Sequence, residues 1–364
     1  MKVSVKQKDL VSAFKLARKA KGKNSLVPIL DEYLVHVLPN KVTIIAGDLD
    51  NFIEVDILSN NADVFSFIVG NQQVKLIEKM DEVVTFEYVN LKLTVSSGKD
   101  ISNSNPFPVE EYPKIDTIDH TNPFIITNTV QFVDRFAKAK RFTSDDDLRP
   151  AMTGINLAFN SGKLEICATD AHKLYTADFE VTGNKEDGSF ICKDLVSGIM
   201  SSIKTVFSIS ISRGVKYALF EVNGNVRIIS RIIDERYPDY KSVIPENTQS
   251  STVNKKQLLT NIEKSLLFAN KTTNKVAFTF FGENVEIHSE DLDYSHEFKS
   301  NFYSKNTGID YPLAIGFNGK YLTSLVKEIK TDTVTLLTSL PNRAATIKLP
   351  NELYLIMPVM LGEY

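Results

Sequence analysis

An aspartate and a histidine two residues apart are the side chains in this sequence best placed to do chemistry. Asp170 and His172 could act together as a general acid and base. Metal chemistry has less support, because the chain has only two cysteines, Cys167 and Cys192, with no CxxC motif and no histidine at metal-ligand spacing. We therefore expect neither a disulfide framework nor a zinc site.

An internal repeat weakens the acid–base interpretation. Asp48 lies 122 residues before Asp170 and Asp291 lies 121 residues after it, yet neither is followed by a histidine at the same spacing. We therefore interpret Asp170 as a turn residue at the end of a strand. No P-loop, GxSxG, HExxH or paired-carboxylate metal motif is present, so we expect no catalytic residues, no metal and no cofactor.

Three hairpin-like segments end at these aspartates and share one pattern. In each, two short runs of alternating apolar residues flank a polar turn, which is Pro39-Asn40-Lys41, Asn160-Ser161-Gly162 or Gly282-Glu283-Asn284. Alternation with a period of two is typical of half-buried antiparallel strands. The spacing makes one unit about 120 residues long, so three units fill the 364-residue chain.

Each unit also contains two helical patterns, followed by further strands. The patterns cover residues 8–23 and 71–80, 128–143 and 193–204, and 254–271 and 319–330. Asn223-Gly224 predicts a hairpin turn in the second unit. The fold class is therefore α+β with antiparallel sheet, in three repeated domains. Turn-prone residues near 121–123 and 246–248 predict domains at 1–121, 122–247 and 248–364.

The charge is distributed unevenly over these elements. The chain carries 42 Lys and Arg against 45 Asp and Glu, a net charge of -3 that at first argues against nucleic acid. The six helical patterns, however, sum to +15 over 84 residues, which leaves -18 for the rest. On a helical wheel, basic residues gather opposite the apolar face of the first helix in each of the first two units: Lys15, Lys19 and Lys23, and Arg135, Lys138 and Arg141. Such faces predict contact with the phosphates of duplex DNA without sequence readout.

The chain shows no sign of a membrane segment. No apolar run approaches the roughly 20 residues that cross a bilayer, and the start MKVSVKQKDL lacks the apolar core of a signal peptide. We expect a cytoplasmic protein.

Three motifs resemble those of the bacterial DNA polymerase III β subunit family, the β sliding clamps. Residues 167–174, CATDAHKL, are similar to the family's Ala-Thr-Asp-Gly-His-Arg-Leu segment. Residues 234–240, DERYPDY, resemble the stretch that joins its second and third domains, and residues 354–361, YLIMPVML, resemble its C-terminal Tyr-Val-Val-Met-Pro-Met-Arg-Leu. The resemblance covers the whole chain.

The resemblance implies a head-to-tail homodimer that closes a six-domain ring, with helices lining a hole around double-stranded DNA. It implies a non-catalytic processivity factor of the DNA polymerase III holoenzyme in DNA replication, with polymerase activity in another chain. The implied partners are the replicative DNA polymerase catalytic subunit, the clamp loader, and other clamp-motif proteins such as repair polymerases, mismatch-repair proteins and ligase. They would bind one hydrophobic pocket per protomer. The alternative is a ring-like protein-interaction scaffold that does not encircle DNA.

The matching motifs also imply site residues. The peptide-binding pocket would comprise Met152, Thr169, Ala171, His172, Lys173, Leu174, Pro238, Ser242, Val243, Leu355, Met357, Pro358, Val359, Met360 and Leu361. DNA contacts by motif position would be Arg149, Lys193, Lys264 and Lys330, to which the wheel adds the six basic residues above. Leu267 and Phe268 match an apolar pair at the dimer interface.

The sequence departs from the family pattern at several of these positions. Ala171, Lys173 and Met360 stand where the family has Gly, Arg and Arg, so we expect a more apolar pocket rim. Residues 145–147, DDD, put the DNA contact of Arg149 in doubt. The chain continues past Leu361 through residues 362–364, a tail that we expect to modulate peptide affinity.

Overall fold

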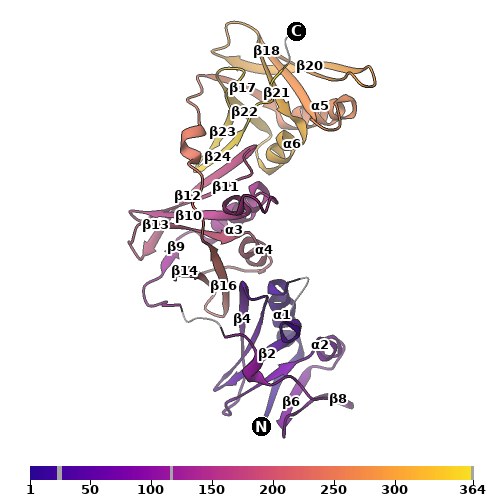
Figure 1. Cartoon of the computed structure of the whole chain (residues 1–364), viewed down its shortest axis with the longest axis vertical. Helices are drawn as coiled ribbons and strands as arrows, with labels where there is room; N and C mark the ends of the chain where they lie inside the picture. The colour runs from indigo at the N-terminus through magenta and orange to yellow at the C-terminus, as the bar shows by residue number, and fades with distance from the viewer. Residues whose placement is uncertain (23–26, 115–117, 362–364) are drawn as a thin grey trace. The chain divides into compact units, whose positions relative to one another are not determined.

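The computed structural model describes residues 1–22, 27–114 and 118–361, and Figure 1 shows the elements under the labels used below. Lys23 and the tail at residues 362–364 lie outside the described residues. The order strand, helix, four strands, helix, three strands occurs three times along the chain.

The elements of the first repeat are β1 (Lys2–Lys6), α1 (Gln7–Ala17), β2 (Tyr33–Leu38), β3 (Lys41–Gly47), β4 (Asn51–Leu58), β5 (Phe65–Val69), α2 (Asn71–Ile77), β6 (Val83–Val89), β7 (Lys92–Ser97) and β8 (Asp100–Ser104). Those of the second are β9 (Phe124–Ile126), α3 (Thr129–Ala139), β10 (Gly154–Asn160), β11 (Lys163–Thr169), β12 (Lys173–Gly183), β13 (Gly188–Lys193), α4 (Leu195–Met200), β14 (Ile209–Arg213), β15 (Tyr217–Val222) and β16 (Val226–Ile233). Those of the third are β17 (Gln249–Asn254), α5 (Lys255–Phe268), β18 (Lys275–Phe281), β19 (Asn284–Asp291), β20 (His296–Thr307), β21 (Leu313–Asn318), α6 (Gly319–Glu328), β22 (Thr333–Thr338), β23 (Ala345–Leu349) and β24 (Glu352–Ile356).

All six predicted helices are present, but they are shorter than the sequence patterns suggested. In the first and second repeats the last turn tightens into a 3-10 helix, η1 (Arg18–Ala20) after α1 and η4 (Lys140–Phe142) after α3. Each repeat also begins with a strand rather than a helix, and three strands rather than two follow each second helix. None of the described helices is both long and apolar enough to span a membrane.

The predicted hairpins are confirmed by their turns. β2 pairs with β3 up to Leu38 and Lys41, and β18 pairs with β19 up to Phe281 and Asn284. Asn223 and Gly224 both have positive φ, 56° and 70°, between β15 and β16. Two left-handed residues in a row match the right-handed twist of the flanking strands, and Asn and Gly adopt that conformation most readily.

The contacts divide the chain into two compact units, and the division runs through the middle repeat. The first unit consists of residues 1–137, 158–164 and 179–234, and the second of residues 138–157, 165–178 and 235–364. Each unit therefore contains one terminal repeat and part of the middle one.

The first unit contains one long antiparallel sheet and one short sheet. The long sheet runs β5, β2, β3, β4, β16, β15, β14, β9, β12, and the short one runs β1, β6, β7, β8. α1 packs against β3, β4 and α2, and Figure 1 shows its place beside β4. A buried cluster that includes Leu34, Phe52, Leu219 and Ile229 draws on both the first and the middle repeat.

The second unit contains a sheet of the same design. Starting from β12, which corresponds to β4 of the first sheet, it runs β12, β24, β23, β22, β17, β20, β19, β18, β21. α5 packs against α6 and against β17 to β20 (Figure 1). A smaller core of Cys167, Leu174, Tyr240, Ala344 and Leu355 again combines residues of two repeats.

Candidate functional site

Two strand pairings join neighbouring repeats, and we call them the first and second joints. In the first joint β4 pairs with β16, from Asn51 opposite Ser230 to Val55 opposite Val226. In the second joint β12 pairs with β24, from Lys173 opposite Ile356 to Ala177 opposite Glu352. In both, the fourth strand of one repeat pairs with the last strand of the next.

The first joint is held by half-buried ion pairs. Arg227 reaches Glu54 at 2.6 Å and Asp56 at 3.1 Å. Lys193 and Arg231 both pair with Asp50. Partial burial would raise the pKa of Asp50, but the hydrogen bonds and positive charges of Lys193 and Arg231 outweigh it and hold the pKa below its usual range.

The second joint is held by a buried carboxylate. Glu352 accepts a hydrogen bond from Lys138 Nζ at 3.1 Å, from Tyr175 Oη at 3.1 Å and from Tyr354 Oη at 2.7 Å. The side chains of Lys138 and Glu352 are only 8% and 9% exposed. Arg141, on η4, adds an ion pair with Glu328 at the end of α6. Three hydrogen bonds to one buried carboxylate fix the two strands in register.

The helical wheel was wrong about Arg135 and Lys138, which are buried in the structure. Arg135 lies over the ring of Phe179, with its guanidinium carbon 5.4 Å from the ring centroid, and Lys138 pairs with Glu352. The wheel assumes that only one side of a helix is covered, whereas α3 has buried residues on both sides. Neither side chain is in a position to contact phosphate.

The other predicted DNA contacts are exposed, except for two. Lys193 is half-buried and paired with Asp50, and Lys23 lies outside the described residues. The exposed members of the set are Lys15, Lys19, Arg141, Arg149, Lys264 and Lys330. Arg141 pairs with Glu328, and Arg149 lies 3.6 Å from Asp146 of the acidic loop. As DNA contacts, all of them stay predictions.

The residues predicted for the peptide pocket divide into a surface set and a supporting set. Buried or nearly buried members are Thr169, Leu174 and Leu355, and the Lys173 ammonium lies over the Phe142 ring and donates to the Arg141 carbonyl. Exposed or half-buried members are Met152, Ala171, His172, Pro238, Ser242, Val243, Met357, Pro358, Val359, Met360 and Leu361. Met360 is 75% exposed.

Main-chain hydrogen bonds hold the C-terminal segment beside the start of β12. Met357 N–H donates to the His172 carbonyl and Val359 N–H donates to the Gly316 carbonyl, both at 2.8 Å. The His172 ring stacks on Tyr321 of α6, with centroids 5.3 Å apart. Residues from the middle and third repeats therefore form one partly apolar surface.

Asp170 has the turn role that the sequence predicted. Its Oδ1 accepts the N–H groups of His172 and Lys173, at 2.9 and 2.8 Å, just before β12 begins. Asp48 does the same for Asp50 and Asn51 before β4. A carboxylate occupied in this way shapes a loop, and the acid–base pairing with His172 has no geometric support. Among the described residues, no group of three or more His, Cys, Asp or Glu side chains could hold a metal ion.

Ala171 stores strain in this turn, because its φ is +72°. We expect Ala171→Gly to raise the free energy of unfolding by up to about 1 kcal/mol, since glycine adopts φ > 0 without the Cβ clash. Urea unfolding would measure the change. Ala139→Gly is the control: Ala139 has an ordinary helical φ of -53°, so the same change should destabilise. Equal losses in both variants would contradict the strain.

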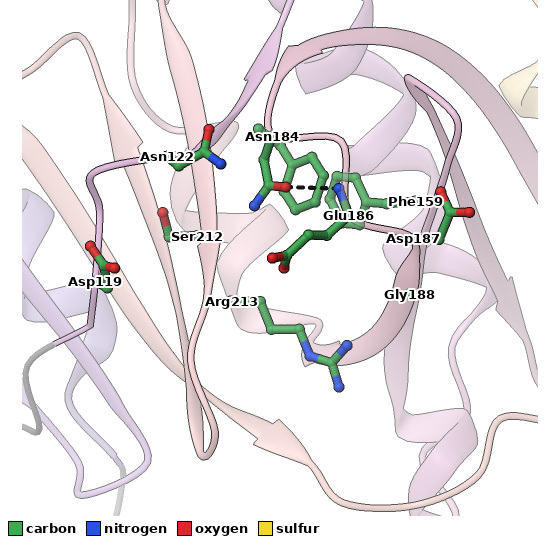
Figure 2. Close-up of a pocket in the computed structure, with 10 residues that line it drawn as sticks. Asp119, Asn122, Phe159, Asn184, Glu186, Asp187, Gly188, Ser212 and Arg213 are labelled. Atoms are coloured by element: carbon green, nitrogen blue, oxygen red, sulfur yellow. Dashed lines mark hydrogen bonds between the residues drawn. The ribbon is translucent and has the colours of Figure 1, made fainter.

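A cavity of about 290 Å³ on the first unit lies apart from both the predicted DNA contacts and the predicted peptide pocket. Figure 2 shows Asp119 and Ser212 on one side of it and Asp187 and Gly188 on the other. The Phe124 and Phe159 rings, stacked with centroids 3.8 Å apart, also line it. Glu186 N–H donates to Asn184 Oδ1 at 2.8 Å within its wall (Figure 2). Its charged side chains are exposed to solvent, and the sequence analysis singled out none of them.

The residues that hold the joints were not predicted from the sequence. Glu352 and Glu328 complete the second joint, and Asp50, Glu54 and Arg227 complete the first. Tyr321, which stacks on His172, was also missed. No signal within a single repeat points to them, because each acts on a strand or helix of another repeat.

Comparisons with known proteins agree with this architecture. Family models of the DNA polymerase III beta subunit match in order along the chain: the N-terminal domain at residues 1–116, the central domain at 130–239 and the C-terminal domain at 241–360. The beta sliding clamp of Rickettsia bellii is 26% identical over 384 aligned residues, covering 99% of each chain. That of Bacillus subtilis is 25% identical and also covers 99% of each.

Solved structures show the same fold. The crystal structure of the DNA polymerase sliding clamp from Bacillus subtilis superposes with a TM-score of 0.90 at 22% identity and covers 99% of each chain. A sliding clamp from Pseudomonas aeruginosa, solved bound to griselimycin, has a TM-score of 0.91 at 17% identity, covering 99% of this chain and 100% of its own.

Three α+β repeats joined through shared antiparallel sheets define the class of three-domain clamp proteins. The chain belongs to the DNA polymerase III beta subunit family, whose three domain models together match most of its length.

Proposed function

We propose that this protein is a DNA sliding clamp: two copies join head to tail into a ring that encircles duplex DNA and tethers a polymerase to it. The observation that carries the proposal is the repeated joint. The fourth strand of one repeat pairs with the last strand of the next in both joints. In the described chain this leaves two segments without such a partner: β8, and residues 296–303 of β20, which pair with β19 but not with β17. Open strand edges of this kind pair readily with another chain.

The apolar pair Leu267 and Phe268 supports joining at these edges. Phe268 stacks on Phe298 of β20, as Phe142 stacks on Tyr175 of β12 in the second joint. Leu267 is 69% exposed. A groove of about 730 Å³ between α2 and the residues around β8, lined in part by Leu76, would receive the Leu267 side chain of a second copy.

Exposed basic residues on the helices support the DNA role. Lys15 on α1 and Lys19 on η1 are exposed and make no ion pair within the described part of the chain. Lysines on a mobile ring would attract phosphates without fixing the DNA register, which suits sliding. Arg141, Arg149 and Lys330 are further candidates from the exposed set.

The double variant Lys15→Glu and Lys19→Glu should load less well onto DNA. The assay is loading onto a nicked circular duplex by a bacterial clamp loader with ATP, followed by gel filtration of the circle. We expect at least about a tenfold lower loaded fraction at low salt, because two phosphate contacts become repulsive. Lys163→Glu with Lys185→Glu, exposed lysines outside the helices, is the control of equal charge. Equal loading of the two variants would contradict the DNA role of α1.

We further propose that the surface at the second joint binds short linear peptides of partner proteins. Support comes from the exposed Met357 and Met360 and the half-buried Val359 in the same segment as the His172 contact, since methionines adapt to several ligands. The partners proposed are the replicative polymerase catalytic subunit, the clamp loader and other clamp-motif proteins of repair, mismatch repair and ligation. The departure at Met360, which is exposed, is expected to favour apolar peptide residues at the rim.

We also propose domain boundaries, a non-catalytic role and a cellular location for the protein. Domain boundaries lie near residues 121 and 247, in the segments between the repeats. The protein has no catalytic role of its own, in line with the turn role of Asp170. Its place of work is the cytoplasm.

A further inference from the structure

The first helices of the three repeats can be placed on one another residue by residue. α1, α3 and α5 begin at Gln7, Thr129 and Lys255. Counted from these starts, buried residues coincide: Leu10 with Phe132 and Leu258, and Phe14 with Phe136 and Ile262. The same count makes three residues equivalent: Leu16, Lys138 and Lys264.

The last strands of the repeats align in the same way. The first residue of each pairs with the end of the preceding strand: Asp100 with Ser97, Val226 with Val222, and Glu352 with Leu349. In both joints the main chain beside this residue makes the same contact, because Asp56 N–H donates to the Asn225 carbonyl and Asp178 N–H donates to the Asn351 carbonyl. Asp100, Val226 and Glu352 are therefore equivalent.

Members of these two sets lie in the same place in both joints: in contact in the second joint and along one groove in the first. In the second joint Lys138 Nζ lies 3.1 Å from Glu352 Oε2, so the two side chains form an ion pair. In the first joint Leu16 and Val226 line one groove of about 710 Å³, and both side chains are apolar. The third combination is Lys264 with Asp100, again of opposite charge, and the two residues lie in different terminal repeats.

Lys264 and Asp100 are both exposed and make no ion pair within the described residues. The surroundings of Lys264 match the second joint, since Phe268 and Phe298 stack as Phe142 and Tyr175 do. We propose that Lys264 of one copy pairs with Asp100 of a second copy where β20 meets β8, and so closes the ring rather than contacting DNA. This inference rests on the proposed head-to-tail dimer.

The register of the new strand pair follows from the same comparison. His296 stands where Asn51 and Lys173 stand, because each is opposite the repeated aspartate. His296 pairs with Asp291 at the end of β19. The Asn51 and Lys173 carbonyls accept hydrogen bonds from the N–H groups of Asp48 and Asp170, which directly follow β3 and β11. Asn51 pairs with Ser230, and Lys173 pairs with Ile356, the fifth residue of β24. The fifth residue of β8 is Ser104. His296 is therefore opposite Ser104 of the second copy, and Ser300 is opposite Asp100.

The test is a charge exchange measured by sedimentation of the full-length protein. Lys264→Glu and Asp100→Lys should each weaken dimerisation at least about tenfold, since each places like charges together. The double variant should regain an affinity within about threefold of the original. Lys256→Glu, exposed on the same helix, is the control and should leave the dimer unchanged. Single variants without effect, or a double variant no better than the singles, would overturn the pairing.

Cysteine cross-linking tests the register independently. Oxidation should join His296→Cys to Ser104→Cys across two copies. The pair Glu297→Cys with Ser104→Cys, shifted by one residue, should not cross-link, because the side chain at position 297 points to the opposite face of the sheet. The native Cys167 and Cys192 are buried and leave the assay clear. A cross-link only in the shifted pair would overturn the register. An unaltered protein that sediments as a monomer would instead overturn the dimer on which the inference rests.

Discussion

Replacing Leu267 by glutamate is expected to turn the dimer into a monomer at micromolar concentration. Leu267 is exposed in the single chain, so the substitution should leave the protomer folded. In the dimer it would put an unpaired carboxylate into the groove lined by Leu76 and Ile68. We expect the dissociation constant to rise at least about 100-fold, which corresponds to about 2.7 kcal/mol.

Sedimentation equilibrium measures this change directly. The matched control is Leu340→Glu, because Leu340 is similarly exposed but lies in the loop between β22 and β23 rather than on α5. The control should keep the dimer mass, and Leu267→Glu should lose it. If both variants remain dimers with unchanged affinity, the apolar pair does not form the interface.

Gly316→Ala is expected to abolish most peptide binding without opening the ring. A Cβ at this position would lie 2.4 Å from the Val359 carbonyl oxygen and 2.9 Å from a Leu361 methyl carbon. The C-terminal segment would have to move away from β21, to which it is held by the Val359 N–H. Overpacking of this kind costs about 1–3 kcal/mol. We expect a tenfold or greater loss of affinity for a clamp-motif peptide, measured by fluorescence anisotropy.

Gly214→Ala is the control for Gly316→Ala. A Cβ there would lie 2.9 Å from the Tyr217 carbonyl oxygen, a similar clash at the β14–β15 turn of the first unit. Its stability should fall while its peptide affinity stays that of the unaltered protein. Unchanged affinity in Gly316→Ala as well would mean that the C-terminal segment is not a wall of the peptide site.

Local patterns were enough to predict the repeat and its elements. Alternation around Pro39-Asn40 and Asn223-Gly224 fixed hairpins, because a period of two and a turn residue act over a few residues. The apolar face predicted for the first helix is buried in the structure, where it includes Leu10 and Phe14. The helix ends were predicted less well, since a tightened last turn such as η4 leaves no mark in the pattern.

Contacts between repeats could not be predicted from these patterns. Lys138 looked like an exposed lysine, but Glu352, 214 residues further along the chain, draws it into the second joint. Arg135 is buried within its own repeat, over the ring of Phe179 on β12, which the pattern of α3 alone does not indicate either. Lys264 holds the same place on α5 and would have its acidic partner in another copy. The sequence of one helix therefore does not distinguish a lysine that contacts DNA from a lysine that forms an ion pair between repeats.

A sliding clamp holds DNA by enclosing it, so its hold should depend on whether the DNA is circular. The protein is loaded onto a nicked circular duplex, the complex is isolated, and the circle is then cut once with a restriction enzyme. A closed ring should stay on the circle through a high-salt wash and leave the linear DNA within minutes, because only topology holds it. Retention on both forms would show ordinary binding, and failure to load on either would favour a scaffold that never encircles DNA; both results would contradict the account.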